Sequence, residues 1–208
     1  MINVNGAKWP AGNLPACPQF TRQAPFRTVA TLLWSGMSPI YPAHLIRQVL
    51  WRGEQLLIRP VRKEDAAGYV AAAKHCSLED ISFRLLRGIR EVSQQLIARF
   101  TEIDYEQTMA FVAEGMKGDI LAITRLVRDG CTKSAEYAII VRTDLQRQGL
   151  GTLMQNMLLE YAKGLGLQEV WGVVDTENRK ALSLNDRFGF TRSFHIDLPF
   201  VRVAKALG

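Results

Sequence analysis

A long amphipathic helix directly after a glycine-rich turn is the feature that most constrains the fold of this chain. After Gly149, apolar residues recur with the 3.6-residue period of a helix that buries one face. The residues of this face are Leu150, Leu153, Met154, Met157, Leu158, Tyr161, Ala162 and Leu165. Gly164 and Gly166 predict the end of the helix, because glycine favours the left-handed residue that commonly follows a helix.

The segments around this helix predict an α+β fold. Strands are expected at Gln55–Arg59, Thr108–Ala113, Ile120–Val127, Ala135–Arg142, Glu169–Asp175 and Ser193–Val203, the last as one strand or a pair interrupted near Pro199. Further helices are expected at Lys63–His75, from Ser77 onward, at Arg90–Phe100 and at Asn178–Arg187. Glycines between the middle strands are typical of an antiparallel meander, so the order predicts helices packed on one mixed sheet.

Residues 1–54 differ from the rest because they hold six of the eight prolines. We expect an irregular N-terminal arm that ends in one short helix over Ala43–Trp51, followed by a single domain over 55–208.

Composition excludes several classes of protein. With 208 residues, of which 48% are hydrophobic and 22% charged, the chain fits one globular domain rather than a disordered protein. No uncharged apolar run reaches the roughly 20 residues that cross a bilayer, and no signal peptide is evident, so we expect a cytoplasmic protein without membrane attachment. Cys17, Cys76 and Cys131 form no C-x-x-C pair and no histidine has metal-ligand spacing, so neither disulfide nor metal is expected.

The net charge of +6 is concentrated in the arm. Residues 1–54 hold five Lys or Arg and one Glu, whereas 55–208 hold 21 basic and 19 acidic residues. No basic run is interleaved with aromatics, so nucleic-acid binding is not expected.

The turn before the long helix carries the clearest functional signal, Gln146-x-x-Gly149-x-Gly151. Glycines let a backbone approach a ligand closely, and the unpaired N–H groups of a helix's first turn attract an anion such as a pyrophosphate. A plain tight turn would also explain glycines here. Neither the G-x-G-x-x-G of a dinucleotide fold nor the G-x-x-x-x-G-K-[ST] of a P-loop fits this position.

Several spaced motifs over residues 55–194 resemble the GCN5-related N-acetyltransferases (GNAT). After the turn come Glu177-Asn178-x-x-Ala181 and Phe188-Gly189-Phe190. Within this superfamily the chain resembles the acetyltransferase domain of bacterial protein-lysine acetyltransferases. The segments that carry this closer resemblance are Leu57-Ile-Arg-Pro60, Glu64-Asp65, Ser77-x-Glu79-Asp80, Arg84, Thr101-x-Ile103-Asp104-Tyr105, Met109-Ala110-x-Val112-Ala113 and Ala135-Glu136-Tyr137.

The resemblance implies a GNAT-like sheet in which two central parallel strands splay apart and acetyl-CoA, as co-substrate, enters the resulting V. These strands would be Ala135–Arg142 and Glu169–Asp175. The pantetheine would pair with the backbone of Ile139, Ile140 and Val141, and the pyrophosphate would lie on the amides of the turn. The turn residues are Gln146, Arg147, Gln148, Gly149, Leu150, Gly151 and Thr152. Asn178 matches an asparagine that hydrogen-bonds the pantetheine, and it also suits a helix N-cap.

Acetyl transfer to an amine needs a base, because a lysine-like ammonium has a pKa of about 10.4. Glu136 lies among apolar neighbours, where burial would raise its pKa, and it matches the proposed general base of the protein-acetylating group. A water-facing glutamate on an edge strand is the alternative. Asp104 and Glu106 are weaker candidates, and Asp104 equally suits a turn cap. Many superfamily members carry a tyrosine that is taken as the general acid for the leaving CoA thiolate, and this chain has Asn185 at that position. The Asn185 amide could hydrogen-bond the CoA sulfur, but it cannot transfer a proton to it.

Three functions remain open from the sequence. The first is acetylation of a protein lysine, with an acyl-CoA synthetase as a target that the resemblance suggests. The second is acetylation of a small amine, and the third is a catalytically weak acyl-CoA sensor, which the missing tyrosine favours. A homodimer is a further expectation.

Overall fold

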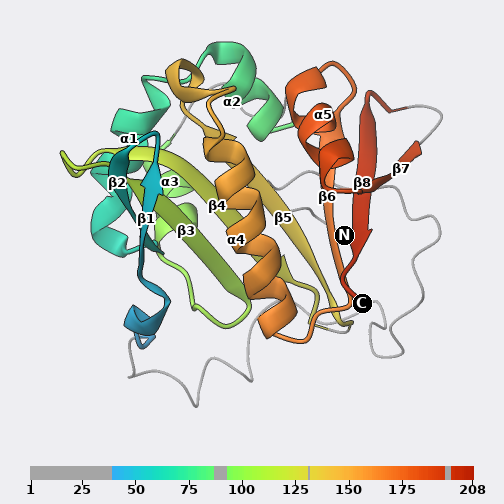
Figure 1. Ribbon diagram of the computed structural model, residues 1–208, viewed down its shortest axis with the longest axis horizontal. Coiled ribbons are helices and arrows are strands. Elements are labelled where there is room, and N and C mark those ends of the chain that lie inside the picture. The colour runs from blue at the N-terminus through green and yellow to red at the C-terminus, as the bar shows by residue number, and fades with distance from the viewer. Residues whose placement is uncertain (1–38, 87–92, 131, 195–197) are drawn as a thin grey trace.

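The computed structural model describes residues 39–86, 93–130, 132–194 and 198–208. Within these ranges the chain forms one eight-stranded sheet with helices on both faces (Figure 1). The strands are β1 (Arg47–Trp51), β2 (Glu54–Pro60), β3 (Thr108–Glu114), β4 (Ile120–Arg128), β5 (Ser134–Val141), β6 (Glu169–Asp175), β7 (Thr191–Phe194) and β8 (Phe200–Ala206). The α-helices are α1 (Ala66–Ala73), α2 (Leu78–Arg84), α3 (Gln94–Thr101), α4 (Leu150–Gly164) and α5 (Arg179–Arg187). Short 3₁₀ helices span Ala43–Leu45, Lys63–Asp65 and Thr143–Leu145.

The strand order is β1-β2-β3-β4-β5-β6-β8-β7. Each neighbouring pair is antiparallel except β5 and β6, which run parallel. A parallel pair needs a crossover connection, and α4 supplies it. This arrangement confirms the predicted α+β class and the mostly antiparallel mixed sheet.

Both faces of the sheet are buried at its centre, and β3 shows how. Met109, Phe111 and Ala113 belong to the cluster that also contains residues of α4. The residues between them, Ala110 and Val112, belong to the cluster of α1 and α3 on the opposite face. Because side chains alternate along a strand, a fully apolar strand is covered on both sides. The faces are called below the α4 face and the α1–α3 face.

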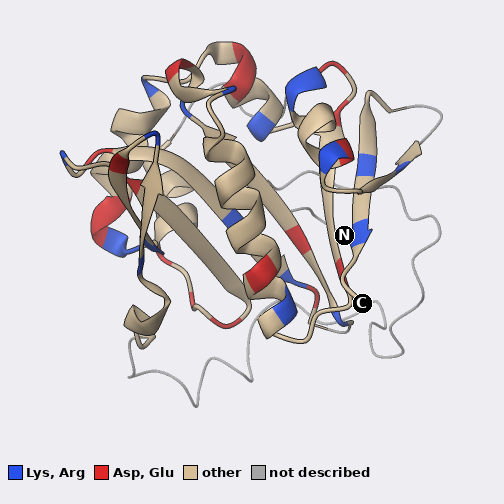
Figure 2. Ribbon diagram, in the orientation of Figure 1, with Lys and Arg blue, Asp and Glu red and all other residues tan. Residues whose placement is uncertain are grey.

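The long helix begins and ends where its sequence predicts. Gly149 is its N-cap residue, with a left-handed φ of 89°, and the helix runs to Gly164. Leu150, Met154 and Leu158 are fully buried on the sheet. Figure 2 shows that α4 and the central strands carry few charges, which gather instead on α2, α5 and the ends of the elements.

The expected helix over Ala43–Trp51 is wrong. Only Ala43–Leu45 is helical, as a 3₁₀ turn, and Arg47–Trp51 is strand β1 in a hairpin with β2. Arg52 and Gly53 have positive φ values of 54° and 82°, as the two central residues of a tight hairpin turn require. The arm's last residues therefore join the sheet, and the boundary at residue 55 itself stays a prediction.

The last predicted strand is a pair, because β7 pairs antiparallel with β8. Ser77 caps α2 as expected, accepting a hydrogen bond from the Asp80 amide at 3.1 Å. Other predictions lie outside the described residues: the arm over 1–38 with Cys17, the helical start at Arg90–Val92, Cys131 and His195.

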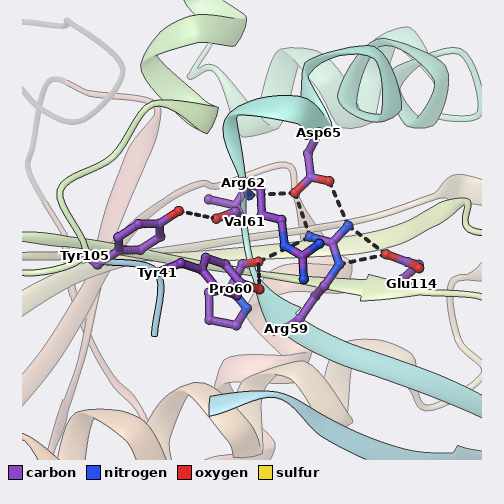
Figure 3. A network of polar contacts seen from close by, with 8 residues as sticks. All are labelled: Tyr41, Arg59, Pro60, Val61, Arg62, Asp65, Tyr105 and Glu114. Atoms are coloured by element: carbon purple, nitrogen blue, oxygen red, sulfur yellow. Dashed lines mark hydrogen bonds and ion pairs between the residues drawn. The ribbon is translucent and has the colours of Figure 1, made fainter. Parts of the chain in front are cut away.

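A buried ion-pair network fixes the end of β2 against the start of α1 (Figure 3). The Arg59 guanidinium donates to Asp65 at 2.7 and 2.8 Å and to Glu114 of β3 at 2.7 Å. Asp65 also accepts from the Arg62 backbone amide at 2.7 Å. Hydrogen bonding to Asp65 raises the pKa of Arg59 above its ordinary value, against the effect of burial. Two of the motifs that carry the family resemblance thus have a structural role.

Candidate functional site

The parallel strands β5 and β6 meet at one end and separate toward the other (Figure 1). Their pairing covers Ser134 with Glu169, Ala135 with Val170 and Glu136 with Trp171, and it stops there although both strands continue. The predicted splay of these two strands is therefore present. On the side facing β6, the backbone of residues 138–141 has no strand partner among the described residues and can pair with a ligand.

A glycine stands where the strands begin to separate. A Cβ on Gly172 of β6 would lie 2.9 Å from Cε1 of Tyr137 and 3.1 Å from its carbonyl oxygen. The Tyr137 ring therefore packs on the Gly172 backbone at the closed end of the V, and no larger residue fits there without a shift. Sequence reasoning gave Gly172 no role, because the contact depends on a partner 35 positions away.

The turn before α4 has the geometry of an anion-binding nest. Arg147 and Gly149 both have positive φ, at 61° and 89°, which turns successive N–H groups toward one side. In the described structure the Gln146 amide donates to the Thr143 carbonyl at 3.4 Å and the Leu153 amide to the Gly149 carbonyl at 3.0 Å, whereas the amides of residues 147–152 between them make no backbone hydrogen bond. These N–H groups are the orphan donors of a helix N-terminus and are available to phosphate oxygens.

Gln146 braces this turn through its side chain. Its amide nitrogen donates to Asp80 of α2 at 2.9 Å and to the Val141 carbonyl at 3.2 Å, and its oxygen accepts from Lys180 of α5 at 2.8 Å. Asp80 also accepts from the Thr143 hydroxyl at 2.5 Å. Burial raises the pKa of Asp80, but these hydrogen bonds and the charge of Lys180 outweigh it and hold the pKa below its usual value.

A cavity of about 620 Å³ opens between β5, β6, the turn and α5. It brings together ten of the residues predicted to hold acetyl-CoA, which are Ile139, Ile140, Val141, Gln146, Arg147, Gly149, Gly151, Thr152, Asn178 and Asn185. Its charged lining is mainly basic, with Arg84, Arg147, Arg179, Lys180 and Arg187 against Asp80. A cleft with this excess of positive charge attracts a polyphosphate.

Two predicted turn residues direct their side chains elsewhere. Leu150 is fully buried in the core under α4. Gln148 bonds the hairpin of β1 and β2, because its carbonyl accepts from Trp51 at 2.8 Å and its side chain accepts from Arg52. The sequence prediction concerned the backbone amides of these two residues, and it stays a prediction.

The two asparagines of α5 both have local partners. Asn178 is the N-cap of α5, with its side-chain oxygen accepting from the Ala181 amide at 3.0 Å, as its alternative role required. Asn185 is buried, accepts a hydrogen bond from the Tyr137 hydroxyl and donates to the Ala181 carbonyl at 2.9 Å. Burial raises the pKa of Tyr137 above its ordinary value despite its polar neighbours. The carbonyl oxygen of Asn185 is therefore engaged, and its predicted contact with the sulfur stays a prediction.

Glu136 lies on central strand β5 and is 8% exposed, so it is not a water-facing glutamate of an edge strand. Strand alternation places it on the α1–α3 face with Ala138 and Ile140, which both line the cavity. The negative charge of Glu136 acts on two arginines, Arg84 of α2 and Arg125 of β4. Burial and, to a smaller extent, the charge of Arg125 together lower the pKa of Arg84 to about 10.

The weaker acidic candidates have other roles or surroundings. Asp104 caps a turn, because its Oδ1 accepts from the amides of Glu106, Gln107 and Thr108 at 3.0, 2.9 and 2.8 Å. Glu106 is exposed.

In the described part of the chain, no group of three His, Cys, Asp or Glu side chains could hold a metal ion, and no helix is long and apolar enough to cross a membrane.

Sequence reasoning did not find Asp80 and Lys180 as braces of the turn, nor Arg125 beside Glu136. The sequence indicates Ser77-x-Glu79-Asp80 and Arg84 only through the family resemblance. These residues matter because α2 contacts the distant glycine turn. A single sequence does not reveal such a long-range contact.

Comparisons with known proteins agree with this geometry. The family model of the acetyltransferase (GNAT) domain matches residues 55–191. The chain is 30% identical over 142 residues to acetyltransferase PA5475 of Pseudomonas aeruginosa, covering 66% of this chain and 76% of that protein. It is also 30% identical over 139 residues to acetyltransferase Pat of Mycolicibacterium smegmatis, covering 66% of this chain and 41% of Pat.

Solved structures show the same fold. The GNAT domain of S. lividans PAT matches with a TM-score of 0.73 at 23% identity, over 80% of this chain and 99% of that domain. Spermidine N-acetyltransferase from Vibrio cholerae, in complex with CoA and spermine, matches with a TM-score of 0.59 at 20% identity, over 73% of this chain and 95% of that one. With two-thirds of its length matched by the family model, the chain belongs to the GNAT acetyltransferase family.

Proposed function

We propose that this acetyltransferase moves acetyl from acetyl-CoA to the ε-amine of a protein lysine by direct attack, with Glu136 as general base. The observation that carries the proposal is the end of β5–β6 pairing at Glu136 and Trp171. It leaves a buried carboxylate at the closed end of the V, next to the cavity that fits the co-substrate. The matches to acetyltransferase Pat and to the GNAT domain of PAT support acetyl transfer, and the resemblance to the protein-lysine acetyltransferases favours a protein as the acceptor.

The residues present fit acetyl-CoA. The turn amides and the basic side chains around them would hold the pyrophosphate, and the unpaired backbone of Ile139–Val141 would pair with the pantetheine. Asn178 lines the cavity while it caps α5 and would contact the pantetheine with its amide nitrogen. Bound acetyl-CoA supplies the activated thioester carbonyl.

The proton and bond changes follow from this placement. Glu136 takes a proton from the lysine ammonium, and the neutral nitrogen forms a bond to the carbonyl carbon. The carbon–sulfur bond then breaks, the electron pair leaves with the CoA thiolate, and the nitrogen gives up its second proton to solvent to form the amide. The positive charge of Arg84, which lines the cavity and interacts with Glu136, favours loss of the ammonium proton, because a nearby like charge lowers an amine's pKa. Solvent water reprotonates the thiolate, since Asn185 has no transferable proton.

A polyamine is the second acceptor class, because a spermidine acetyltransferase shares the fold. The two arginines whose charges interact with Glu136 repel a polycation, and this favours an acceptor with a single ammonium group. A cytoplasmic location and a homodimer stay predictions.

Replacing Glu136 tests the proposed base. We expect Glu136→Gln to lower turnover about tenfold or more, because general-base catalysis contributes at least this factor, while acetyl-CoA affinity stays nearly unchanged. Thiol release and acetyl-CoA titration measure the two effects. Glu106→Gln, an exposed glutamate in the loop before β3, is the matched control and should leave both unchanged. Wild-type turnover in Glu136→Gln would remove Glu136 as the base.

A further inference from the structure

A second, smaller cavity of about 80 Å³ lies on the α1–α3 face of the sheet. It is several times larger than the space that one water needs. Its walls are mainly apolar, and its polar lining includes Tyr69, Arg84 and Arg125. Arg84 and Ile140 line this cavity and the larger one, so the two spaces adjoin.

Two residues of this wall each have a buried polar atom without a hydrogen-bond partner in the described structure. The Tyr69 hydroxyl and the Arg125 Nε are each buried and make no hydrogen bond within the described structure. Another nitrogen of Arg125, Nη1, donates to the Arg99 carbonyl at 3.0 Å, which holds the side chain in place. Buried donors are nearly always satisfied in proteins, so two unsatisfied donors on residues that line one cavity indicate a missing acceptor.

Two cationic side chains also line the cavity. The guanidinium carbons of Arg84 and Arg125 lie 5.4 and 5.3 Å from the centre of the Phe100 ring, which brings two cations to one aromatic side chain. Burial lowers the pKa of both arginines, and Arg84 at about 10 remains protonated at neutral pH. Burial raises the pKa of Tyr69, so its hydroxyl stays a donor.

A carboxylate meets these requirements. It brings negative charge and acceptor oxygens for the Arg125 and Tyr69 donors, and the bidentate fork of arginine suits it. The apolar wall, with Leu85, Leu96 and Phe100, suits the methylene groups that carry such a carboxylate better than it suits a fully hydrated inorganic anion.

The cavity lies beside the proposed base. Arg125 pairs with Ala138 of β5, two residues from Glu136 on the same face of the sheet. Neighbouring and diagonal positions on one face of a sheet are within reach of one another. An acceptor with its amine at Glu136 can therefore place an attached carboxylate near Arg125.

We propose that this cavity binds a carboxylate of the acceptor, so that the enzyme prefers lysines with an aspartate or glutamate close by in the acceptor protein. This inference rests on the proposed function, because it names the class of acceptor for the same site. It assigns Arg125 and Tyr69 to specificity rather than to the chemical step.

Paired peptides test this preference. A set of lysine peptides carries one glutamate at one of the two positions on either side of the lysine, and each has a twin with glutamine there. We expect the best glutamate peptide to exceed its twin about tenfold in kcat/KM, the size of one charge-assisted hydrogen bond. Free glutamate, free lysine and spermidine are tested as acceptors in parallel.

Variants then locate the effect. Arg125→Gln should abolish the preference by slowing only the glutamate peptide, and Arg125→Lys, which keeps the charge, should retain part of it. The control Arg128→Gln changes an exposed arginine on the same strand and should keep the full preference. Thermal melting checks that each variant folds.

The outcomes separate the two claims. Equal acetylation of both twins, or a preference that survives Arg125→Gln in a folded protein, would overturn the carboxylate site and leave the proposed function standing. No acetylation of any peptide would overturn the proposed function. Acetylation of free amino acids alone, with dependence on Arg125, would keep the carboxylate chemistry and overturn the protein acceptor.

Discussion

Two glycines in the turn before α4 serve different purposes at the residue scale. Gly149 has a φ of +89°, and a Cβ there would meet nothing within 4 Å, so only the backbone conformation requires glycine. Gly151 has no positive φ, and a Cβ would make ordinary contacts at 3.6 Å to Leu184 and 3.8 Å to Val141. Gly151 lines the large cavity, so the absence of a side chain there leaves room for the ligand.

Alanine at each glycine should separate stability from binding. We expect Gly149→Ala to lower the free energy of unfolding by about 1–2 kcal/mol, the cost of a left-handed L-residue. Gly151→Ala should leave stability unchanged or raise it by up to about 1 kcal/mol, because alanine favours a helix. It should weaken acetyl-CoA binding, because the added methyl group keeps the phosphates from the backbone. Urea unfolding and calorimetric titration measure these effects, and undiminished acetyl-CoA affinity in Gly151→Ala would contradict the placement of the pyrophosphate.

Residue identity predicted local backbone conformation better than it predicted contacts between residues that are distant in the sequence. The Gln146-x-x-Gly149-x-Gly151 turn was identifiable because glycine restrictions act within a few residues. The hydrogen bond from Tyr137 to Asn185 joins residues 48 positions apart, and the residues around Arg125 come from α1, α2, α3 and β5. Such contacts are set by the packing of the sheet and have no local pattern.

At the scale of elements, the Arg59–Asp65 pair joins β2 to α1. Arg59 and Asp65 are 6% and 8% exposed, so removing one partner leaves a buried charge. We expect Asp65→Asn to lower the free energy of unfolding by about 3 kcal/mol, the lower end of the cost of breaking a buried pair. The neighbouring exposed Glu64→Gln should change it by less than about 0.5 kcal/mol. Similar urea midpoints for both variants would show that the pair contributes little.

Asp80 connects α2, the glycine turn and α5, and this predicts a pH dependence. Its folded pKa lies below its ordinary value, so its contribution to stability is present above an unfolded pKa of about 3.9 and is lost as pH falls through the folded pKa. Asp80→Asn should reduce stability at neutral pH and weaken the loss of stability below about pH 4. The exposed Glu79→Gln is the control, and urea midpoints across pH test the effect. An unchanged acid limb in Asp80→Asn would contradict it.

Elements with a strong local period were predicted well, and those that depend on pairing were not. Helix α4 was predictable because its apolar face repeats over four turns. The helix prediction fails at β1 because its five residues gain their conformation from pairing with β2, and Arg-Gly is a weak hairpin signal. Because of the interruption near Pro199, the sequence was compatible with one strand or with two. The structure has two strands, β7 and β8, which pair with each other.

At the scale of the whole molecule, the two faces of the sheet have different roles. On the α4 face, helix α4 holds the glycine turn in place and covers the hydrophobic core. On the α1–α3 face lie Glu136, Arg125 and the small cavity. The splay of β5 and β6 connects the two sides, so a thioester bound in the V can meet an amine from the other face.

The measurement that tests this account most directly is thiol release from acetyl-CoA by the purified chain. It is run in parallel with a desalted protein extract and with the small-molecule fraction of that extract. We expect release with the protein fraction, together with acetylated lysines identified by mass. Measurable acetyl-CoA binding without release in either fraction would contradict a catalytic role and favour an acyl-CoA sensor, and release with metabolites alone would contradict the protein acceptor.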